Sequence, residues 1–128
     1  MRDLRTYDYA IVRVVPRVER GEFVNAGIII SCDVERILEA DIDLDENTLL
    51  ALDGAVDLEA VRRALAVIPL ICLGGSEAGP IGRLSARERF HWLVSPKSTI
   101  VQTSPVHTGR CDDIAAALDH LMKRMIRR

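Results

Sequence analysis

The stretch that decides the fold is residues 7–32, YDYAIVRVVPRVERGEFVNAGIIISC. In its first part, residues 7–15, successive residues alternate between the two faces of a predicted strand. This part is also rich in β-forming residues. Pro16 ends this strand, because proline has no amide proton for a strand ladder. A charged turn, residues 17–22, leads into residues 23–32, which predict a second strand. Two such runs joined by a short turn predict an antiparallel hairpin.

Two further segments extend the hairpin into a sheet. Residues 35–42, ERILEADI, predict a third strand, so that the three strands form an antiparallel meander. Gly27 lies inside the second strand, where glycine favours a bulge or the close approach of another backbone. Residues 99–103 predict a short edge strand, and residues 105–109 predict a turn.

Helical spacing and capping residues predict the helices. Ser85 and Glu88 form a capping box, in which the serine accepts a bond from the third helical amide and the glutamate reaches back. We expect Pro69 to end or kink its helix, and LGGSEAGPIG, residues 73–82, to be a flexible loop. The predicted helices are 45–52, the segment that Asp57 opens and Pro69 closes, the segment from Ser85 to Val94, and a last helix capped by Asp112.

These elements predict the fold class. We expect one α+β domain over residues 1–128, with a three- to four-stranded antiparallel sheet, a meander, packed by three to four helices. With 128 residues, 48% of them hydrophobic, the chain can bury a core without disulfides or metal.

Composition also limits the location and the cofactors. The three cysteines, Cys32, Cys72 and Cys111, are far apart and form no Cys-x-x-Cys pair, which favours a reducing cytosol and argues against a disulfide framework. The start, MRDLRTYDY, has no apolar signal region, and the longest apolar run, Ala64–Leu73, is too short to span a membrane. We therefore expect a cytoplasmic protein with no membrane segment and no cofactor.

Charge is unevenly distributed along the chain. Residues 33–59 hold ten acids and one base, whereas residues 83–128 hold nine bases and four acids. One interpretation of this uneven distribution is two solvated faces of opposite charge. The alternative is a basic surface that binds an anion or an acidic partner. A sequence pI near 5.9 and only five aromatic residues argue against nucleic-acid binding.

Several polar residues are candidates for a binding site. Arg13 lies among apolar neighbours and needs a partner, for which Glu22 or Asp8 are candidates, and Asn25 is poorly suited to a strand unless its amide pairs near Gly27. The segment SPKSTIVQTSPVHTG, residues 95–109, is either a loop that satisfies its own hydrogen bonds or a ligand surface. The candidate binding residues are Arg13, Glu22, Asn25, Arg87, Arg89, Gln102, Ser104, His107 and Thr108.

Catalytic and metal motifs are weak. His107 and Cys111 are four apart with Gly109 between them, and nothing specifies the contact that a Cys–His pair needs. His91, His107 and His120 do not match metal-ligand spacing, so we expect no metal. The glycine-rich residues 74–79 lack the Gly-Lys-Ser/Thr ending of a phosphate loop.

Four blocks together resemble a known family. They are YDYAIVRVVP (7–16), RGEFVNAGI (20–28), SARERF (85–90) and STIVQTSPVHTG (98–109). This combination is similar to a bacterial family of domains of unknown function, number three-zero-three-seven, over nearly the whole chain. The resemblance implies a small cytosolic bacterial protein, encoded near a kinase-like protein of the HipA type. It also implies that Arg13, Glu22, Asn25, Gly27 and the 98–109 segment form one site.

Three functions follow as expectations. The leading one is a non-enzymatic protein-interaction module, an accessory or neutralising partner of a HipA-like kinase, with the polar loop and its neighbouring arginines as the contact surface. The alternative is an enzyme or binder of small phosphate-bearing ligands, in which Arg13, Arg87, Gln102 and His107 line the pocket. A third, weaker option is nucleic-acid binding by the basic last helix. The sequence is also compatible with a homodimer that forms through a sheet edge or through the last helix.

Overall fold

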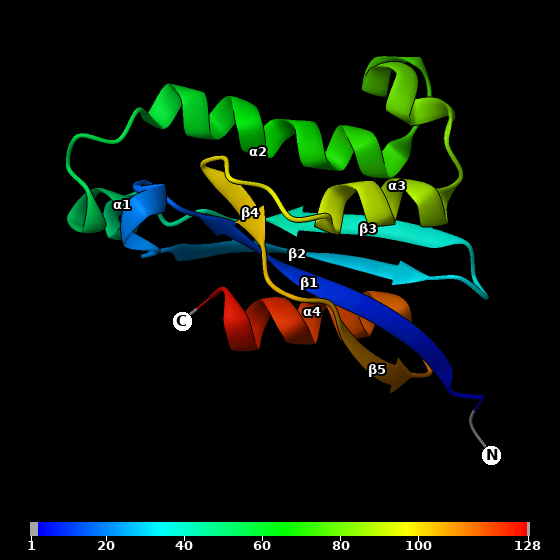
Figure 1. Cartoon of the computed structure of the whole chain (residues 1–128). Helices are drawn as coiled ribbons and strands as arrows, with labels where there is room; N and C mark the ends of the chain where they lie inside the picture. The colour runs from blue at the N-terminus through cyan, green and yellow to red at the C-terminus, as the bar shows by residue number, and fades with distance from the viewer. Residues whose placement is uncertain (1–2, 128) are drawn as a thin grey trace.

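Figure 1 shows the protein as a computed structural model, in which residues 3–127 are described. These described residues form one antiparallel sheet of five strands, with four α-helices and two 3₁₀ helices. In chain order the elements are β1 (Arg5–Val14), η1 (Val18–Arg20), β2 (Val24–Cys32), β3 (Ile37–Ile42), α1 (Glu46–Leu52), α2 (Leu58–Leu73), η2 (Ser76–Arg83), α3 (Ala86–Val94), β4 (Val101–Thr103), β5 (His107–Cys111) and α4 (Ile114–Met125).

The sheet is built around β1. Its strand order is β3-β2-β1-β4, and β5 also pairs with β1, so that β4 and β5 share the edge of β1 that β2 does not use. β4 pairs with the end of β1, from Val12 to Val14, and β5 pairs with its beginning, from Arg5 to Tyr9. The predicted α+β class and meander are confirmed.

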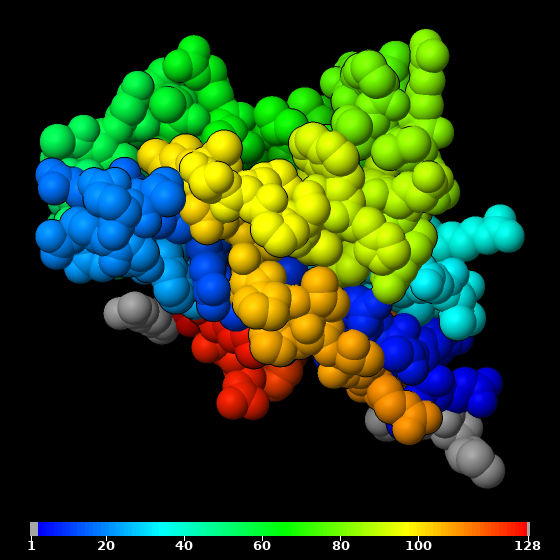
Figure 2. Space-filling view, in the orientation of Figure 1, coloured from blue at the N-terminus to red at the C-terminus, as the bar shows by residue number. Residues whose placement is uncertain are grey.

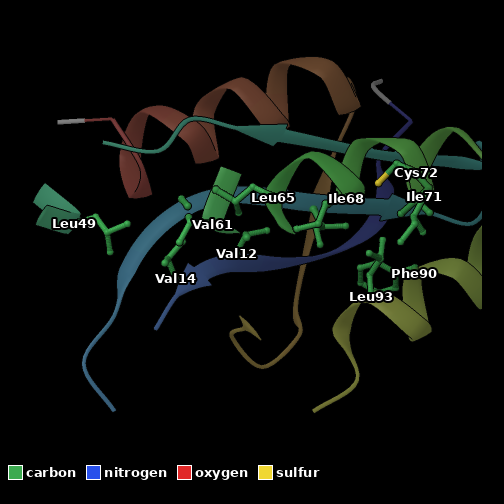
Figure 3. Close-up of a cluster of buried hydrophobic side chains, with 13 residues drawn as sticks. Val12, Val14, Leu49, Val61, Leu65, Ile68, Ile71, Cys72, Phe90 and Leu93 are labelled. Atoms are coloured by element: carbon green, nitrogen blue, oxygen red, sulfur yellow. The ribbon is translucent and has the colours of Figure 1, made fainter. Parts of the chain in front are cut away.

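Helices cover both faces of the sheet. In Figure 1, α2 and α3 lie on one side and α4 on the other. The alternation of β1 explains this arrangement, because one face of a strand takes every second residue. Val12 and Val14 enter the core beneath α2 and α3, which Figure 3 shows, whereas Tyr7, Tyr9 and Ile11 pack against the cluster beneath α4.

The predicted irregularity at Gly27 is confirmed in both of its forms. The register between β1 and β2 shifts between Val12 and Arg13, which pair with Gly27 and Asn25, so that Ala26 is the extra residue of a bulge. Gly27 also lies against the next strand, where an added Cβ would be only 2.5 Å from the backbone oxygen of Asp41. The bulge reverses the alternation of side chains along β2, so that each residue after it faces the other side of the sheet. The bulge also places Asn25 beside Arg13.

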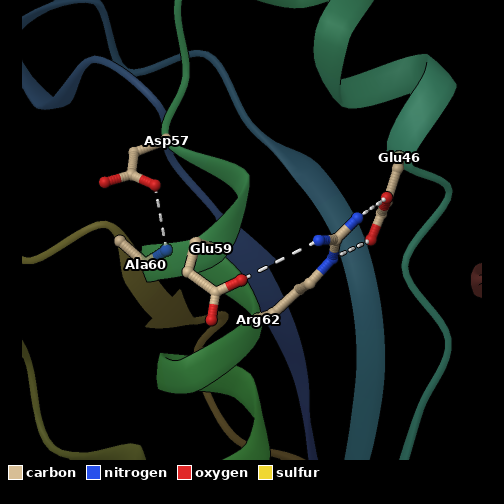
Figure 4. Close-up of polar contacts among 5 residues, drawn as sticks. All are labelled: Glu46, Asp57, Glu59, Ala60 and Arg62. Carbon is tan, nitrogen blue, oxygen red and sulfur yellow. Dashed lines mark hydrogen bonds and ion pairs between the residues drawn. The ribbon is translucent and has the colours of Figure 1, made fainter.

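The helix starts follow local chemistry. Asp45 and Asp57 each accept a bond from the backbone amide three residues on, and the capping box of Ser85 and Glu88 forms as predicted. Figure 4 shows the Asp57 cap on Ala60, at 3.1 Å. The predicted cap at Asp112 is wrong by one residue: Asp113 caps α4, through a bond from the amide of Ala116.

Three other local predictions are corrected. The predicted turn over residues 105–109 is largely the strand β5, whose backbone groups pair with β1. Of the two outcomes expected at Pro69, an end of the helix is wrong, because α2 continues to Leu73. The glycine-rich segment is not wholly a loop, since η2 occupies residues 76–83.

The carboxyl half of α2 is apolar on its outward face as well as on its buried face. Val61, Leu65 and Ile68 are buried. On the opposite side, four exposed apolar residues form what we call the α2 stripe, namely Ala66, Val67, Leu70 and Leu73. Among the described residues no single helix is long and apolar enough to cross a membrane, although α2 and η2 pass that test as a pair bent by 62°.

Candidate functional site

The first group of candidate residues is a row across three strands. Arg13 of β1 lies opposite Asn25 of β2 and opposite Gln102 of β4. Directly opposed residues of antiparallel strands share a face, so the three side chains lie in one row, on the side of α4. The structure thus brings together three of the residues that the sequence singled out.

Arg13 is held in an unusual environment. Its guanidinium carbon lies 4.1 Å from the centroid of the Phe23 ring, a cation–π contact. It makes no ion pair with any residue from 3 to 127, and its Nε is buried without a hydrogen-bond partner there. The predicted ion pair is therefore wrong, because Asp8 pairs with Arg87 and Glu22 pairs with Arg20.

Asn25 fixes the end of α4 to the sheet. Its Nδ2 donates to the carbonyl of Met125 at 3.4 Å, rather than to backbone near Gly27 as predicted. Its Oδ1 is buried and has no partner within the described chain. Two neighbouring side chains, Arg13 and Asn25, thus carry a buried donor and a buried acceptor that are not satisfied, which is rare in native proteins.

A hollow of about 590 Å³ lies beside this row. Asn25 forms part of its wall, and Arg127 closes another part through its bond to the carboxylate of Asp43, at 2.9 Å. The remaining lining residues are Phe23, Val24, Asp45, Thr48, Met125 and Ile126. The hollow has the size of a small-molecule site, and its walls are mixed, with apolar and charged side chains.

The second group lies on the other face of the sheet, below α3. The Nη2 of Arg87 lies 2.8 Å from the Oδ2 of Asp8, and its Nε lies 3.5 Å from Asp33. Thr108 donates to the other oxygen of Asp8, at 2.7 Å, and Ser31 accepts from Arg87 at 3.4 Å. Arg87 and Thr108 therefore both bond to the carboxylate of Asp8, within the protein itself. The sequence offered Asp8 only as a partner for Arg13, but Asp8 is the centre of this group.

Arg89 closes the carboxyl end of α2. Its Nη1 donates to the carbonyls of Ile71 and Cys72, at 2.7 and 2.6 Å, and its Nε donates to the carbonyl of Leu84. These contacts satisfy carbonyls that a helix end leaves without a partner. The guanidinium of Arg89 is engaged by backbone oxygens rather than presented to solvent.

The polar segment 95–109 mainly bonds to itself and to β1. Gln102 donates to the carbonyl of Thr99, at 2.9 Å. Ser104 is buried; its Oγ accepts from the amide of Ile11 at 2.8 Å and donates to the carbonyl of Pro105. Ser104 thereby fills the gap between β4 and β5 along the edge of β1. In Figure 2 this segment, yellow to orange, crosses the front of the molecule.

Glu22 and His107 lie away from both groups. Glu22 is exposed and bonds to Arg20 at 2.6 Å. His107 is exposed on β5, with its ring 5.3 Å from the ring of Tyr9. The candidate residues are therefore spread over several places rather than gathered in one pocket.

The cysteine thiols are placed for packing. Burial raises the pKa of the Cys72 thiol to about 12, although the nearby Arg89 opposes that rise. Burial also raises the pKa of Cys111. Thiols with raised pKa values hold little thiolate at neutral pH and are poor nucleophiles. Within residues 3–127, no group of three or more His, Cys, Asp or Glu side chains is arranged to hold a metal ion.

Comparison with known proteins gives one match. The model of a family described as "Protein of unknown function (DUF3037)" matches residues 9–126. No curated protein matches the chain, and no solved structure matches it.

Proposed function

The chain belongs to the DUF3037 family, and from that premise we propose that it is a protein-interaction module that acts as an accessory partner of a HipA-like kinase. The observation that carries a binding role is the α2 stripe. A helix that is apolar all round is normally covered on every side. Here Val67, Leu70 and Leu73 are 47%, 36% and 81% exposed on the face turned away from the sheet.

The polar groups support binding over catalysis. Arg87, Arg89, Gln102 and Ser104 are each engaged within the molecule, by a carboxylate or by backbone. Side chains that already bond to fixed partners are part of the scaffold. The kinase would meet a second exposed surface, separate from the α2 stripe, which β5 and the segment before it form with Val106 and His107.

The test is co-expression with the HipA-like kinase encoded nearest to this chain in its genome. We expect a complex of defined mass in light scattering after size exclusion. The change Val106→Asp with His107→Ala should weaken it, whereas Val34→Asp, at an apolar residue that is 79% exposed elsewhere, should not. If the chain and the kinase elute separately at micromolar concentrations, the kinase partnership is wrong.

A second candidate function has its own observation. The guanidinium of Arg13 makes no ion pair with residues 3–127 and stacks on Phe23 beside the 590 Å³ hollow, which favours an anionic group such as a phosphate. Gln102 lies next to Arg13, but Arg87 lies on the opposite face of the sheet, so the four-residue pocket first expected reduces to Arg13 and Gln102 with the walls of the hollow.

A ligand that binds only the folded state raises its stability as the ligand concentration exceeds Kd. The test is therefore thermal unfolding with a panel of nucleotides and sugar phosphates, for wild type beside Arg13→Gln. A ligand that stabilises wild type and not the variant supports this function. An unchanged Tm across the panel removes it.

A further inference from the structure

We propose that a second copy of this chain covers the α2 stripe, with the two α2 helices packed antiparallel about a two-fold axis. The proposal rests on the binding role proposed for this face and names its partner. The stripe and the Arg63 side chain before it have the dimensions of a helix–helix contact, because the eleven residues from Arg63 to Leu73 span about 15 Å. Ala66, a small residue within the stripe, allows the two helices to approach closely.

Charge identifies the second copy as the occupant. Two opposite charges flank the stripe at its two ends: Arg63 on the first half of α2 and Glu77 on η2. Both side chains are exposed, and neither makes a hydrogen bond or ion pair with a residue between 3 and 127. In contrast, the adjacent Arg62 is taken by Glu46, at 2.6 Å, and by Glu59, at 4.0 Å, as Figure 4 shows. The charged groups of Arg63 and Glu77 are thus both exposed beside the α2 stripe.

An isologous contact matches these charges. If the two-fold axis passes between Val67 and Leu70, Val67 packs against the partner's Leu70, and the reverse contact follows by symmetry. Arg63 then lies level with the carboxyl end of the partner's α2, where η2 begins and where the partner's Glu77 stands. Each ion pair is formed twice, at the two ends of one apolar strip.

The shape of this face agrees with a helix laid across it: Figure 2 shows a notch above the middle of α2, with η2 (yellow-green) rising beside it at the carboxyl end of the helix.

Sedimentation velocity on the full chain, over a concentration series, tests the proposal. We expect a dimer for wild type. Leu70→Glu should raise the dimer Kd by roughly 100-fold, because a charge would be buried at the centre of the contact in both copies. Val34→Glu is the matched control, since Val34 is an exposed apolar residue outside the stripe, and it should leave Kd unchanged. Circular dichroism checks that each variant keeps its helices.

Charge reversal tests the register. Arg63→Glu and Glu77→Arg should each weaken the dimer about tenfold, since like charges would meet twice. An equimolar mixture of these two variants should form a heterodimer of near wild-type affinity, because each contact then joins opposite charges. Recovery in the mixture supports the antiparallel pair. Failure of the mixture to associate, or a monomeric wild type, overturns it.

The fate of the kinase complex separates this inference from the proposed function. A wild-type monomer whose kinase complex is lost in Leu70→Glu would show that the face binds the kinase, so the second copy is the wrong occupant and the interaction module stands. A dimer that disappears in Leu70→Glu while no kinase binds would support the inference and remove the kinase partner.

Discussion

Arg87 of α3 and Asp8 of β1 form an ion pair across 2.8 Å that fastens a helix to the central strand. The pair is only partly exposed, and Thr108 of β5 bonds to the same carboxylate. One side chain of β1 thus joins the helical layer to the edge strand.

This relationship predicts a measurable coupling. Arg87→Ala should lower the free energy of unfolding by about 1–2 kcal/mol, because it leaves a partly buried carboxylate without its cation. In a double-mutant cycle with Asp8→Ala, measured by urea unfolding, we expect a coupling of about 1 kcal/mol. Arg20→Ala, which removes an exposed pair with Glu22, is the control and should change stability far less than Arg87→Ala. Strict additivity of Arg87→Ala and Asp8→Ala would contradict the prediction.

Gly27 should not tolerate a side chain. In Gly27→Ala the new Cβ would lie 2.5 Å from the backbone oxygen of Asp41, which cannot move without breaking the pairing of β2 with β3. We expect a loss of about 3 kcal/mol in urea unfolding. Gly54→Ala is the matched control, because its nearest contact is at 3.7 Å, and it should cost less than about 1 kcal/mol. Equal effects of the two changes would show that β3 can shift.

Ser104 should contribute more to the free energy of unfolding than its place in a polar segment suggests. Ser104→Ala removes the acceptor of the Ile11 amide and should cost about 1–3 kcal/mol. Native-state hydrogen exchange of the Ile11 amide should accelerate more than that of its neighbours in β1. Ser98→Ala, at an exposed serine of the same segment, should stay within about 0.5 kcal/mol of wild type. An Ile11 amide that remains equally protected would mean that water or another group takes over the bond.

Cys72 should make stability fall at alkaline pH. Its folded-state pKa of about 12 lies above the ordinary value of 9.0, so between these values the folded thiol keeps its proton while the unfolded thiol loses it. The unfolded state then binds fewer protons, and the free energy of unfolding falls as pH rises above about 9, by about 1.4 kcal/mol per pH unit at most. Comparing wild type with Cys72→Ala between pH 8 and 10.5 isolates this contribution. Parallel pH profiles for the two proteins would show that the thiol ionises freely.

Local chemistry explains which elements the sequence predicted well. The strands around residues 7–15 and 23–32 follow from alternation and β propensity, and the caps at Asp57 and Ser85 depend on bonds that span three residues. In contrast, β5 carries a polar sequence, and only its pairing with β1 makes it a strand. Gly109 is tolerated there because the ring of Tyr7 covers it, a contact made across the sheet.

The candidate site was less predictable, for a related reason. Sequence could mark Arg13, Asn25 and Gln102 as polar residues in strands, but their common row depends on the register that the bulge sets. Two carboxylates, those of Asp8 and Glu22, were plausible partners for Arg13, yet each is taken by another arginine. The stripe on α2 had a visible signal in the apolar run Ala64–Leu73, whose length shows that both sides of the helix, and not one, are apolar.

The sharing of one edge of β1 between β4 and β5 has a consequence for how the protein folds during synthesis. The strand that organises the sheet is made first, but its second neighbour is made last; the bond between Asp8 and Thr108, for example, joins residues 100 positions apart. Contacts of such high contact order slow folding, and they cannot form until residues 101–111 have left the ribosome. The nascent chain would therefore expose one edge of β1, a ready template for aggregation, until residues 101–111 arrive.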